Sequence, residues 1–399
     1  MPIVVLAGTL DTKGHEYAFV RDRLREQQVD VVLVDVGVYP PQIEPDISRE
    51  DVAHAAGENV GALAEAGDRG AATTAMGSGA AAMLLRLQAE GRLDGVLGLG
   101  GSGGSSIVTT AMRALPVGVP KLMVSTLASG DTRPYVGAVD ITMMYSVVDI
   151  AGINSVSSRI LTNAAGAIAG MVKASVPPLE HKPLVAASMF GVTTQGVTYA
   201  RDRLEELGYE VLVFHATGTG GQSMETLVAA GFVAGVLDLT TTELADELVG
   251  GVLSAGPQRL EAAGAAGVPQ VVSLGALDMV NFGPRETVPA SFEGRNLYVH
   301  NPTVTLMRTT PQENSALGRE VKRKLAAAEG PTALFIPRKG VSMIAVAGQP
   351  FHDADADEAL FAEVKDSGDV EVHDLDLDVN DKRFAVAMAD RLHEMITNR

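Results

Sequence analysis

Gly98-Leu-Gly-Gly-Ser-Gly-Gly-Ser-Ser106 is the stretch of this sequence that decides the fold class. It follows the short apolar run Gly95-Val-Leu97 and precedes the stretch 107–115, an order that predicts a strand, a glycine loop and a helix. Glycine has no Cβ, so its backbone N–H groups can approach an anion, and the first amides of a helix favour a phosphate. The stretch therefore predicts a phosphate-binding loop. The alternative is a structural turn that packs the helix closely on a sheet.

The spacing Gly98-x-Gly100-x-x-Gly103 matches the glycine pattern of dinucleotide-binding domains. That pattern usually lies in the first strand–helix unit and is followed by an acid about 20 residues later. Here the acid at the far end of the next predicted strand, 121–125, is Asp131, which lies beyond another glycine. No glycine is followed by the Lys-Ser/Thr pair of a Walker loop. These departures weaken a nicotinamide interpretation and leave the phosphate interpretation standing.

Composition limits the class of protein. The 399 residues are 46% hydrophobic and 20% charged, which predicts a soluble globular protein of two or three domains. A formal charge of −18 argues against nucleic acid or an anionic membrane as a partner. Cysteine is absent, which excludes disulfides, thiolate zinc sites and a cysteine nucleophile. Because no signal peptide and no apolar run of ~18 residues is found, we expect a cytoplasmic protein.

The first 35 residues predict one strand–helix–strand unit. Stretches 3–7 and 31–34 are apolar throughout, as parallel strands covered on both faces are, and 15–28 has helical spacing. Ligands of such sheets bind beyond the carboxyl ends of the strands. The loops at 8–14 and 125–132 are therefore expected to form a site together with the glycine loop.

An internal repeat predicts two units of the same winding. Thr12-Lys13-Gly14 recurs as Thr194-Gln195-Gly196, and Arg21-Asp-Arg-Leu24 recurs as Arg201-Asp-Arg-Leu204. The fold class that follows is α/β, with two Rossmann-like doubly wound parallel-sheet subdomains. We place the nucleotide-binding domain at 1–180 and the second domain, with a C-terminal extension, at 181–399.

The two copies differ where chemistry is expected. The first has Asp11 and Lys13 in its opening loop, whereas the second has Thr193 and Gln195. The second copy also replaces the glycine run with Leu239-Thr-Thr-Thr-Glu243. Charge suited to a phosphate and its metal ion therefore survives in the first half only, although the glycine turn at 217–221 predicts that the second half binds a ligand of its own.

The remaining chain gathers polar residues near 300–313. Arg308 lies between apolar residues and two threonines, and a guanidinium suits a carboxylate or a phosphate; a buried Arg–Glu pair is an equal alternative. Asp353-Ala-Asp-Ala-Asp357 lacks the glycine and the final glutamate of a calcium loop and instead predicts a helix N-cap. Stretch 373–378 alternates like an edge strand, and 383–396 predicts a closing amphipathic helix.

Five motifs together resemble the bacterial and plant family that includes the ATP-binding N-terminal region of the tomato mosaic virus resistance protein. They are Gly8-Thr-Leu-Asp-Thr-Lys-Gly14, Gly100-Gly-Ser-Gly-Gly104, Ser125-Thr-Leu-Ala-Ser-Gly130, Ser146-Val-Val-Asp-Ile-Ala-Gly-Ile-Asn154 and His300-Asn-Pro-Thr-Val-Thr-Leu-Met-Arg308. The resemblance covers essentially the whole chain. It implies two Rossmann-like subdomains, ATP held in the first of them with Mg²⁺, and self-association as a homodimer or a higher homo-oligomer.

The resemblance implies nucleotide contacts on three loops and a metal ion on a carboxylate. The nucleotide-binding positions are Thr9, Asp11, Thr12 and Lys13 in the first loop, Gly101, Ser102, Gly103, Gly104 and Ser105 in the second, and Ser125, Thr126, Ser129 and Gly130 in the third. Asp11 or Asp131 would hold magnesium directly or through water.

Three functions remain open. The first is an ATP-dependent enzyme, a transferase or ligase, in which Arg308, His300 and Glu313 present a small carboxylate or phosphorylated metabolite to the nucleotide at a cleft between the halves. The second is a non-catalytic, nucleotide-responsive regulatory protein. The third and weaker one is an NAD-dependent oxidoreductase.

Overall fold

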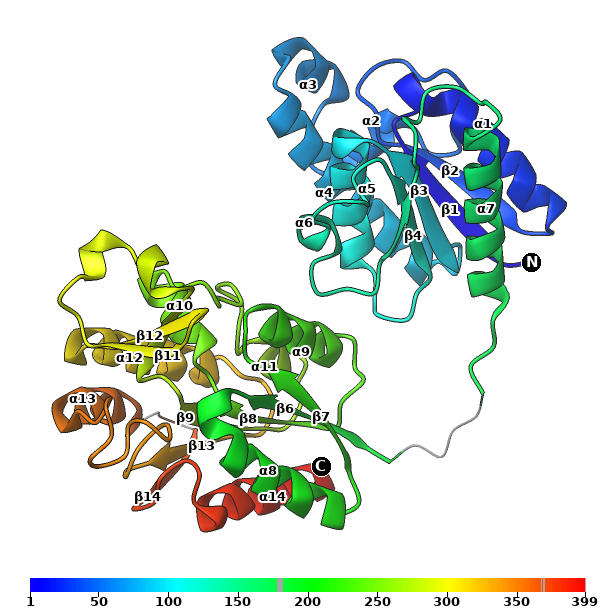
Figure 1. Ribbon diagram of the computed structural model, residues 1–399. Coiled ribbons are helices and arrows are strands. Elements are labelled where there is room, and N and C mark those ends of the chain that lie inside the picture. The colour runs from blue at the N-terminus through cyan, green and yellow to red at the C-terminus, as the bar shows by residue number, and fades with distance from the viewer. Residues whose placement is uncertain (178–181, 367, 369, 399) are drawn as a thin grey trace. The chain divides into compact units, whose positions relative to one another are not determined.

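The computed structural model describes residues 1–177, 182–366, 368 and 370–398 (Figure 1). The chain divides into two compact units, Met1–Pro178 and Leu179–Arg399. Each unit is an α/β structure built on a parallel sheet, which confirms the predicted fold class of two Rossmann-like units. The boundary that we predicted between 180 and 181 lies outside the described residues.

The first unit contains a five-stranded parallel sheet in the order β2-β1-β3-β4-β5. The strand order reverses between β1 and β3, and this switch point is where ligands of doubly wound sheets bind, beyond the carboxyl ends of the strands. The strands are β1 (Ile3–Gly8), β2 (Asp30–Asp35), β3 (Gly95–Gly100), β4 (Lys121–Ser125) and β5 (Thr142–Tyr145).

Alternate residues of each strand point to opposite faces of the sheet, and both sets are apolar. Helices therefore cover both faces. Val4 and Leu6 of β1 pack against α1 (Leu10–Glu26) and α7 (Ser157–Lys173). Val5 and Ala7 pack on the other face, which is covered by α2 (Arg49–Ala55), α4 (Arg69–Ala89) and α5 (Ser102–Ala114). Two short helices complete the unit: α3 (Val60–Ala66) and α6 (Arg133–Val136).

Tyr17 of α1 holds the two strands at the switch point together. Its hydroxyl donates to the carbonyl of Ala7 on β1 (2.6 Å) and accepts from the N–H of Leu99 on β3 (2.7 Å). Burial raises the pKa of this phenol well above its ordinary value. A Cβ on Gly8 would overlap the Tyr17 ring, so the glycine at the end of β1 is required by this contact.

The second unit contains a six-stranded parallel sheet in the order β14-β13-β9-β8-β6-β7. Read from the other edge, the first four strands are β7-β6-β8-β9, and they correspond one by one to β2-β1-β3-β4 of the first unit. The repeat in the sequence is therefore also a repeat in topology. The strands are β6 (Leu184–Met189), β7 (Glu210–His215), β8 (Gly235–Thr240), β9 (Gln270–Gly275), β13 (Thr332–Pro337) and β14 (Glu371–Leu375).

Helices again cover both faces, and an antiparallel sheet is added. Helices α8 (Thr194–Glu206) and α14 (Lys382–Thr397) pack on one face. The other elements are α9 (Thr219–Ala229), α10 (Glu243–Val249), α11 (Ala262–Ala265), α12 (Pro311–Ala326), α13 (Ala354–Val364), the 3₁₀ turns Gly191–Thr193, Arg285–Thr287 and Ala290–Phe292, and the small sheet β10 (Met279–Phe282), β12 (Val304–Arg308) and β11 (Leu297–Asn301).

Several local predictions for the second half are confirmed. The edge strand appears as β14, the closing helix as α14, and Asp353 caps α13 by accepting from the N–H of Ala356 at 3.0 Å. None of the helices in the described part of the chain has the length and apolar character needed to cross a membrane.

Candidate functional site

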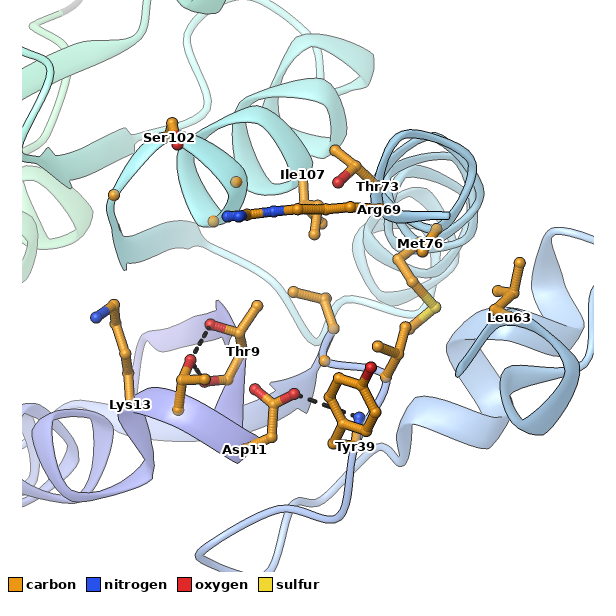
Figure 2. A pocket seen from close by; sticks show the side chains of 18 of the residues that line it. Thr9, Asp11, Lys13, Tyr39, Leu63, Arg69, Thr73, Met76, Ser102 and Ile107 are labelled. Carbon is orange, nitrogen blue, oxygen red and sulfur yellow. Dashed lines mark hydrogen bonds between the residues drawn. The ribbon is translucent and has the colours of Figure 1, made fainter. Parts of the chain in front are cut away.

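A cavity of about 570 Å³ lies at the switch point of the first unit (Figure 2). Its walls are formed by the loops that follow β1, β2 and β3, by the first turns of α1 and α5, by residues of α3 and α4, and by Asp149. The cavity brings together eight of the residues predicted to bind a nucleotide: Thr9, Asp11, Thr12, Lys13, Gly101, Ser102, Gly103 and Gly104.

The glycine loop presents the start of α5 to this cavity. Gly101 is the N-cap of α5, and no side chain caps the helix. The first backbone bond of the helix runs from the N–H of Ser105 to the carbonyl of Gly101 (2.9 Å), so the preceding amides have no acceptor within the helix. A Cβ on Gly100 would lie 3.0 Å from the Cα of Gly104, which explains the second glycine of the run. The loop can therefore donate several N–H groups to an anion.

Two cationic side chains lie at the same end of the cavity. The backbone of Lys13 departs from helical geometry (φ −132°, ψ 21°), so residues 9–13 form a turn ahead of the main part of α1. Its Nζ donates to the carbonyl of Ile150 at 2.5 Å. Arg69 reaches in from the first turn of α4, with Nη2 3.1 Å from the position that a Cβ on Gly103 would occupy. Both cations can offset the charge of a phosphate.

The opposite end of the cavity is apolar. Figure 2 shows Leu63 and Met76 at this end, with Tyr39 beside them, whereas Lys13 and Ser102 lie at the other end. An elongated ligand with an anionic group at one end and an apolar ring at the other fits this division of polarity.

Metal binding by protein side chains alone is not supported. Within the described ranges, no group of three or more His, Asp or Glu side chains is placed to hold a metal ion. Asp11 and Asp149 are carboxylates that line the cavity. Asp131, the other predicted metal ligand, does not line it: Asp131 is paired with Arg133 at 2.8 Å, and this pair lowers the pKa of Asp131 to about 2.

The third predicted loop does not line the cavity. The hydroxyls of Ser105 and Ser125 are buried and bond to each other at 2.7 Å, so they join α5 to the end of β4. Thr126 donates its N–H to the carbonyl of Gly100 (3.2 Å). Ser129 and Gly130 belong to the same loop, and neither is part of the cavity wall.

Two of the three predicted catalytic residues, Arg308 and Glu313, have structural partners in the second unit. Arg308 is buried, and its Nη2 pairs with Asp357 at 2.6 Å while its Nε donates to the carbonyl of Phe351 at 2.8 Å. Glu313 pairs with Arg295 at 2.7 Å and caps the start of α12. The buried pair considered for Arg308 therefore exists, but its acid is an aspartate 49 residues later. His300 is exposed on β11. The catalytic roles stay predictions.

The glycine turn of the second unit is filled by the carboxylate of Glu243. Oε1 of Glu243 accepts from the N–H groups of Gly218 (2.7 Å) and Gly221 (3.1 Å), at the start of α9. Arg259 donates to Oε2 of the same side chain at 2.7 Å. Two of the amides that we expected to bind a ligand, those of Gly218 and Gly221, are therefore already used by the protein.

The three threonines that replace the first-half glycine run are also engaged. Thr240 shares a hydrogen bond of 2.7 Å with Thr193, Thr241 donates to the carbonyl of Ser273 (3.1 Å), and Thr242 accepts from Asn281 (3.3 Å).

The sequence interpretation missed Arg69 and the apolar end of the cavity. Arg69 belongs to no motif, and it follows the N-cap Asp68, whose carboxylate accepts from Gly70 N–H at 2.9 Å. Asp68, an acid before a helix of small residues, is a recognisable N-cap signal. This signal does not indicate that Arg69, the next residue, faces Gly103, 34 positions later. Packing of α4 beside α5 determines that contact.

A glycine-lined cavity at the switch point of one doubly wound unit, followed by a second unit of the same winding, defines a class of two-domain α/β proteins. The chain belongs to the UPF0261 family. Residues 2–177 match the family described as "Uncharacterised protein family (UPF0261) N-terminal domain", and residues 182–396 match its C-terminal domain.

Relatives in this family cover the whole chain. A UPF0261 protein of Clostridium tetani is 54% identical over 398 residues, 98% of each chain, and one of Mesorhizobium japonicum is 47% identical over 395 residues. The ToMV resistance protein Tm-1(GCR237) of Solanum lycopersicum is 40% identical over 422 residues, which span 99% of this chain and 56% of the tomato protein. The predicted family is confirmed, and ATP binding stays a prediction.

UDP-N-acetylglucosamine 2-epimerase from Rickettsia bellii aligns with 68% of this chain and 78% of its own, at 12% identity and a TM-score of 0.23. A similarity at this level carries no argument about function.

Proposed function

We propose that the first unit binds ATP with Mg²⁺ in the cavity at its switch point, and that the protein uses this nucleotide as an ATP-dependent enzyme on a small acidic metabolite. The observation that carries the proposal is the division of the cavity into a phosphate-suited end and an apolar end. The free amides of α5, Lys13 and Arg69 would hold phosphate oxygens, while Tyr39, Leu63 and Met76 would contact the base.

The cavity fits a magnesium ion that arrives with the nucleotide. Mg²⁺ in nucleotide sites keeps several waters and is bound by phosphate oxygens together with one or two carboxylates. Asp11, Asp68 and Asp149 are the carboxylates on the cavity wall. Asp68 is already engaged as the N-cap of α4, where it accepts from the N–H groups of Gly70 and Ala71. When bound, the ion would offset phosphate charge and polarise the transferred phosphoryl group.

Calorimetric titration with ATP, ADP and NAD, each with and without Mg²⁺, tests the binding. The enzyme proposal is then tested by measuring phosphate release in the presence of a pool of small carboxylic acids. Magnesium-dependent ATP binding with acid-stimulated release is the expected result. Binding of NAD alone would favour the oxidoreductase, and no nucleotide binding at all would mean that the glycine loop is structural.

Gly101→Val is expected to reduce ATP affinity by at least about tenfold, because the added side chain enters the anion-binding end of the cavity. The backbone tolerates the change: Gly101 has φ −82°, and a Cβ there would meet only Thr126 Oγ1, at 3.7 Å. Gly170→Val is the matched control, since Gly170 of α7 has open space around it. Unchanged affinity in a folded Gly101→Val protein would contradict the phosphate assignment.

Arg69→Ala is expected to weaken ATP binding about 10- to 100-fold, the loss typical of a hydrogen bond to a charged group. The loss should be largest for ATP and smallest for adenosine, because Arg69 faces the phosphate end. Arg86→Ala serves as the control, since Arg86 is an exposed arginine in the last turn of the same helix. Calorimetry with both ligands measures the difference, and an equal loss for ATP and adenosine would place Arg69 outside the phosphate site.

One contact favours the regulatory alternative. Lys13 holds the carbonyl of Ile150 and thereby ties the first loop to the segment 146–154. A phosphate that attracted Lys13 would loosen this segment, so that nucleotide occupancy would change the surface of the unit. Tight ATP binding without phosphate release in any acid pool would support this function over an enzyme.

A further inference from the structure

The carboxylate of Asp11 is incompletely hydrogen-bonded in the described structure. Oδ2 accepts from the backbone N–H of Tyr39 at 3.3 Å, a long bond. Oδ1 is shielded from solvent and has no partner. A shielded carboxylate oxygen without a donor is costly, so a ligand that brings a hydrogen-bond donor to this side chain would be favoured.

Asp11 stands over Gly37, just beyond the carboxyl end of β2. A Cβ on Gly37 would lie 2.9 Å from Cγ of Asp11, so the missing side chain at 37 makes room for the carboxylate. Dinucleotide-binding units carry an acid in this part of the fold, where it hydrogen-bonds the ribose hydroxyl of the ligand. In this chain the acid would be delivered from the start of α1.

The acid that ends β2 itself, Asp35, cannot serve this purpose. It is fully buried, and its Oδ1 accepts from the N–H groups of Leu10 (3.2 Å) and Gly37 (2.9 Å). Asp35 does not line the cavity. It instead holds the first turn of α1 and the loop after β2 together, which fixes the position of Asp11 above Gly37.

The place of Asp11 along the cavity matches the middle of a nucleotide. Figure 2 shows it between the end marked by Lys13 and Ser102 and the end marked by Leu63. A phosphate would be repelled by the carboxylate, whereas a neutral hydroxyl donates to it. In a nucleotide the sugar lies between the phosphates and the base, so its hydroxyls come to this side chain.

We propose that Asp11 hydrogen-bonds the ribose hydroxyls of the bound nucleotide and makes the cavity selective for ribonucleotides. The inference rests on the proposed function, because it needs a nucleotide in the cavity. Rotation about Cβ–Cγ exchanges the two carboxylate oxygens, so either of them can meet the ligand. The magnesium ion then depends on phosphates, water and Asp149 rather than on Asp11.

The experiment compares ATP with 2′,3′-dideoxy-ATP on the full chain by calorimetry, each with Mg²⁺ and with EDTA. The wild-type protein is expected to bind ATP at least about tenfold more tightly than the dideoxy analogue, since a site built for a hydroxyl rejects a ligand that lacks it. In Asp11→Ala the two ligands should bind within about twofold of each other. The ratio of affinities with and without Mg²⁺ should be unchanged.

A second variant moves the carboxylate without removing it. Gly37→Ala would push the Asp11 side chain aside, and because the atoms it meets are the end of a side chain, the fold should be kept. The same loss of ribose preference is expected. Gly166→Ala on α7, where nothing lies within 4 Å of the new Cβ, is the control. Circular dichroism confirms that each variant is folded.

Two results would overturn the inference while leaving the proposed function in place. One is equal wild-type affinity for ATP and its dideoxy analogue. The other is an Asp11→Ala protein that keeps the ribose preference and loses its dependence on Mg²⁺, which would make Asp11 a metal ligand. Failure of the wild-type protein to bind ATP would instead overturn the proposed function and this inference with it.

Discussion

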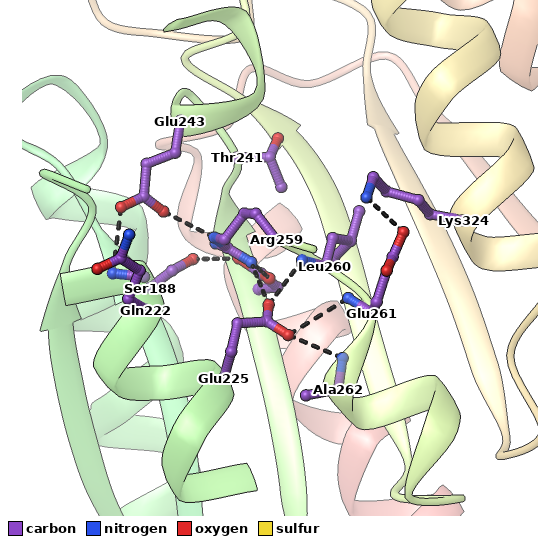
Figure 3. A network of polar contacts seen from close by, with 12 residues as sticks. Ser188, Gln222, Glu225, Thr241, Glu243, Arg259, Leu260, Glu261, Ala262 and Lys324 are labelled. Atoms are coloured by element: carbon purple, nitrogen blue, oxygen red, sulfur yellow. Dashed lines mark hydrogen bonds and ion pairs between the residues drawn. The ribbon is translucent and has the colours of Figure 1, made fainter. Parts of the chain in front are cut away.

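Replacing Arg259 with leucine is expected to destabilise the second unit by about 3–5 kcal/mol, the usual cost of removing one partner from a buried ion pair. Arg259 is fully buried and forms two bonds to Asp238, at 2.5 and 2.7 Å. It also pairs with Glu243 at 2.7 Å and with Glu225 at 3.2 Å (Figure 3). Without the arginine, these carboxylates would lose the cation that they share.

The loss of Arg259 should also destabilise the start of α9. Burial raises the pKa of Glu243, and its attraction to Arg259 opposes that rise. When the arginine is lost, Glu243 will tend to take up a proton and weaken its hold on the amides of Gly218 and Gly221. Hydrogen exchange measures the stability of the second unit separately, and exchange in α9 should rise first.

A surface pair provides the control for Arg259. Arg285 and Glu293 form an ion pair at 3.0 Å in which both side chains are largely exposed. Arg285→Leu should leave hydrogen exchange in the second unit unchanged, because exposed ion pairs contribute little to stability. If Arg259→Leu were as harmless as this control, the buried network would not be a stabilising element of the unit.

Relative to the wild type, Asp246→Asn is expected to have a higher free energy of unfolding at pH 8 than at pH 5. Burial raises the pKa of Asp246 from 3.8 to about 7, against the hydrogen bonds from Asn281 that lower it. The folded state therefore binds the proton more tightly than the unfolded chain does. The stability that this proton contributes is fully present below about pH 4 and is lost as the pH rises toward 7. Asparagine carries no charge and removes this loss.

The expected size follows from the two pKa values. Between pH 5 and pH 8, the difference in unfolding free energy between Asp246→Asn and the wild type should grow by about 2–3 kcal/mol in favour of the variant. Asparagine also fits the site: Oδ1 can still accept from the N–H of Asn281, as Asp246 does at 3.0 Å. In the wild type, Oδ1 of Asn281 has no hydrogen-bond partner in the described structure. If the Asn281 amide flips in the variant, this oxygen can accept from the new amide nitrogen at position 246.

Urea unfolding at several pH values, followed by hydrogen exchange in the second unit, makes this measurement. Asp202→Asn is the control, because Asp202 is exposed on α8. Its unfolding free energy should follow the wild-type pH dependence. A difference between Asp246→Asn and the wild type that stays constant from pH 5 to pH 8 would show that Asp246 is ionised throughout this range.

Features that depend on local pattern were predictable from the sequence. The predicted strands at 3–7, 31–34 and 121–125 appear within one residue or so of β1, β2 and β4, because continuous apolar runs form strands that are buried on both faces. The repeat predicted two units, and the two sheets share the order of their first four strands.

The use of polar side chains was less predictable. Ser125 was expected to touch a ligand, yet its hydroxyl bonds to Ser105 inside the protein. Arg308 was expected either to bind a carboxylate or phosphate or to form a buried Arg–Glu pair, but the fold brings Asp357 to it. Conversely, nothing in the sequence around Arg69 indicated that it faces Gly103.

The sequence by itself determined the winding of both units, the glycine loop before α5 and the replacement of Asp11 and Lys13 by uncharged residues in the second copy. These follow from apolar periodicity and from the absence of a Cβ, which act over a few residues. Only the tertiary structure decided which polar groups face the cavity and which are satisfied inside the protein. The reason is physical: a buried charge or hydroxyl must find a partner, and packing of distant elements determines which partner is within reach.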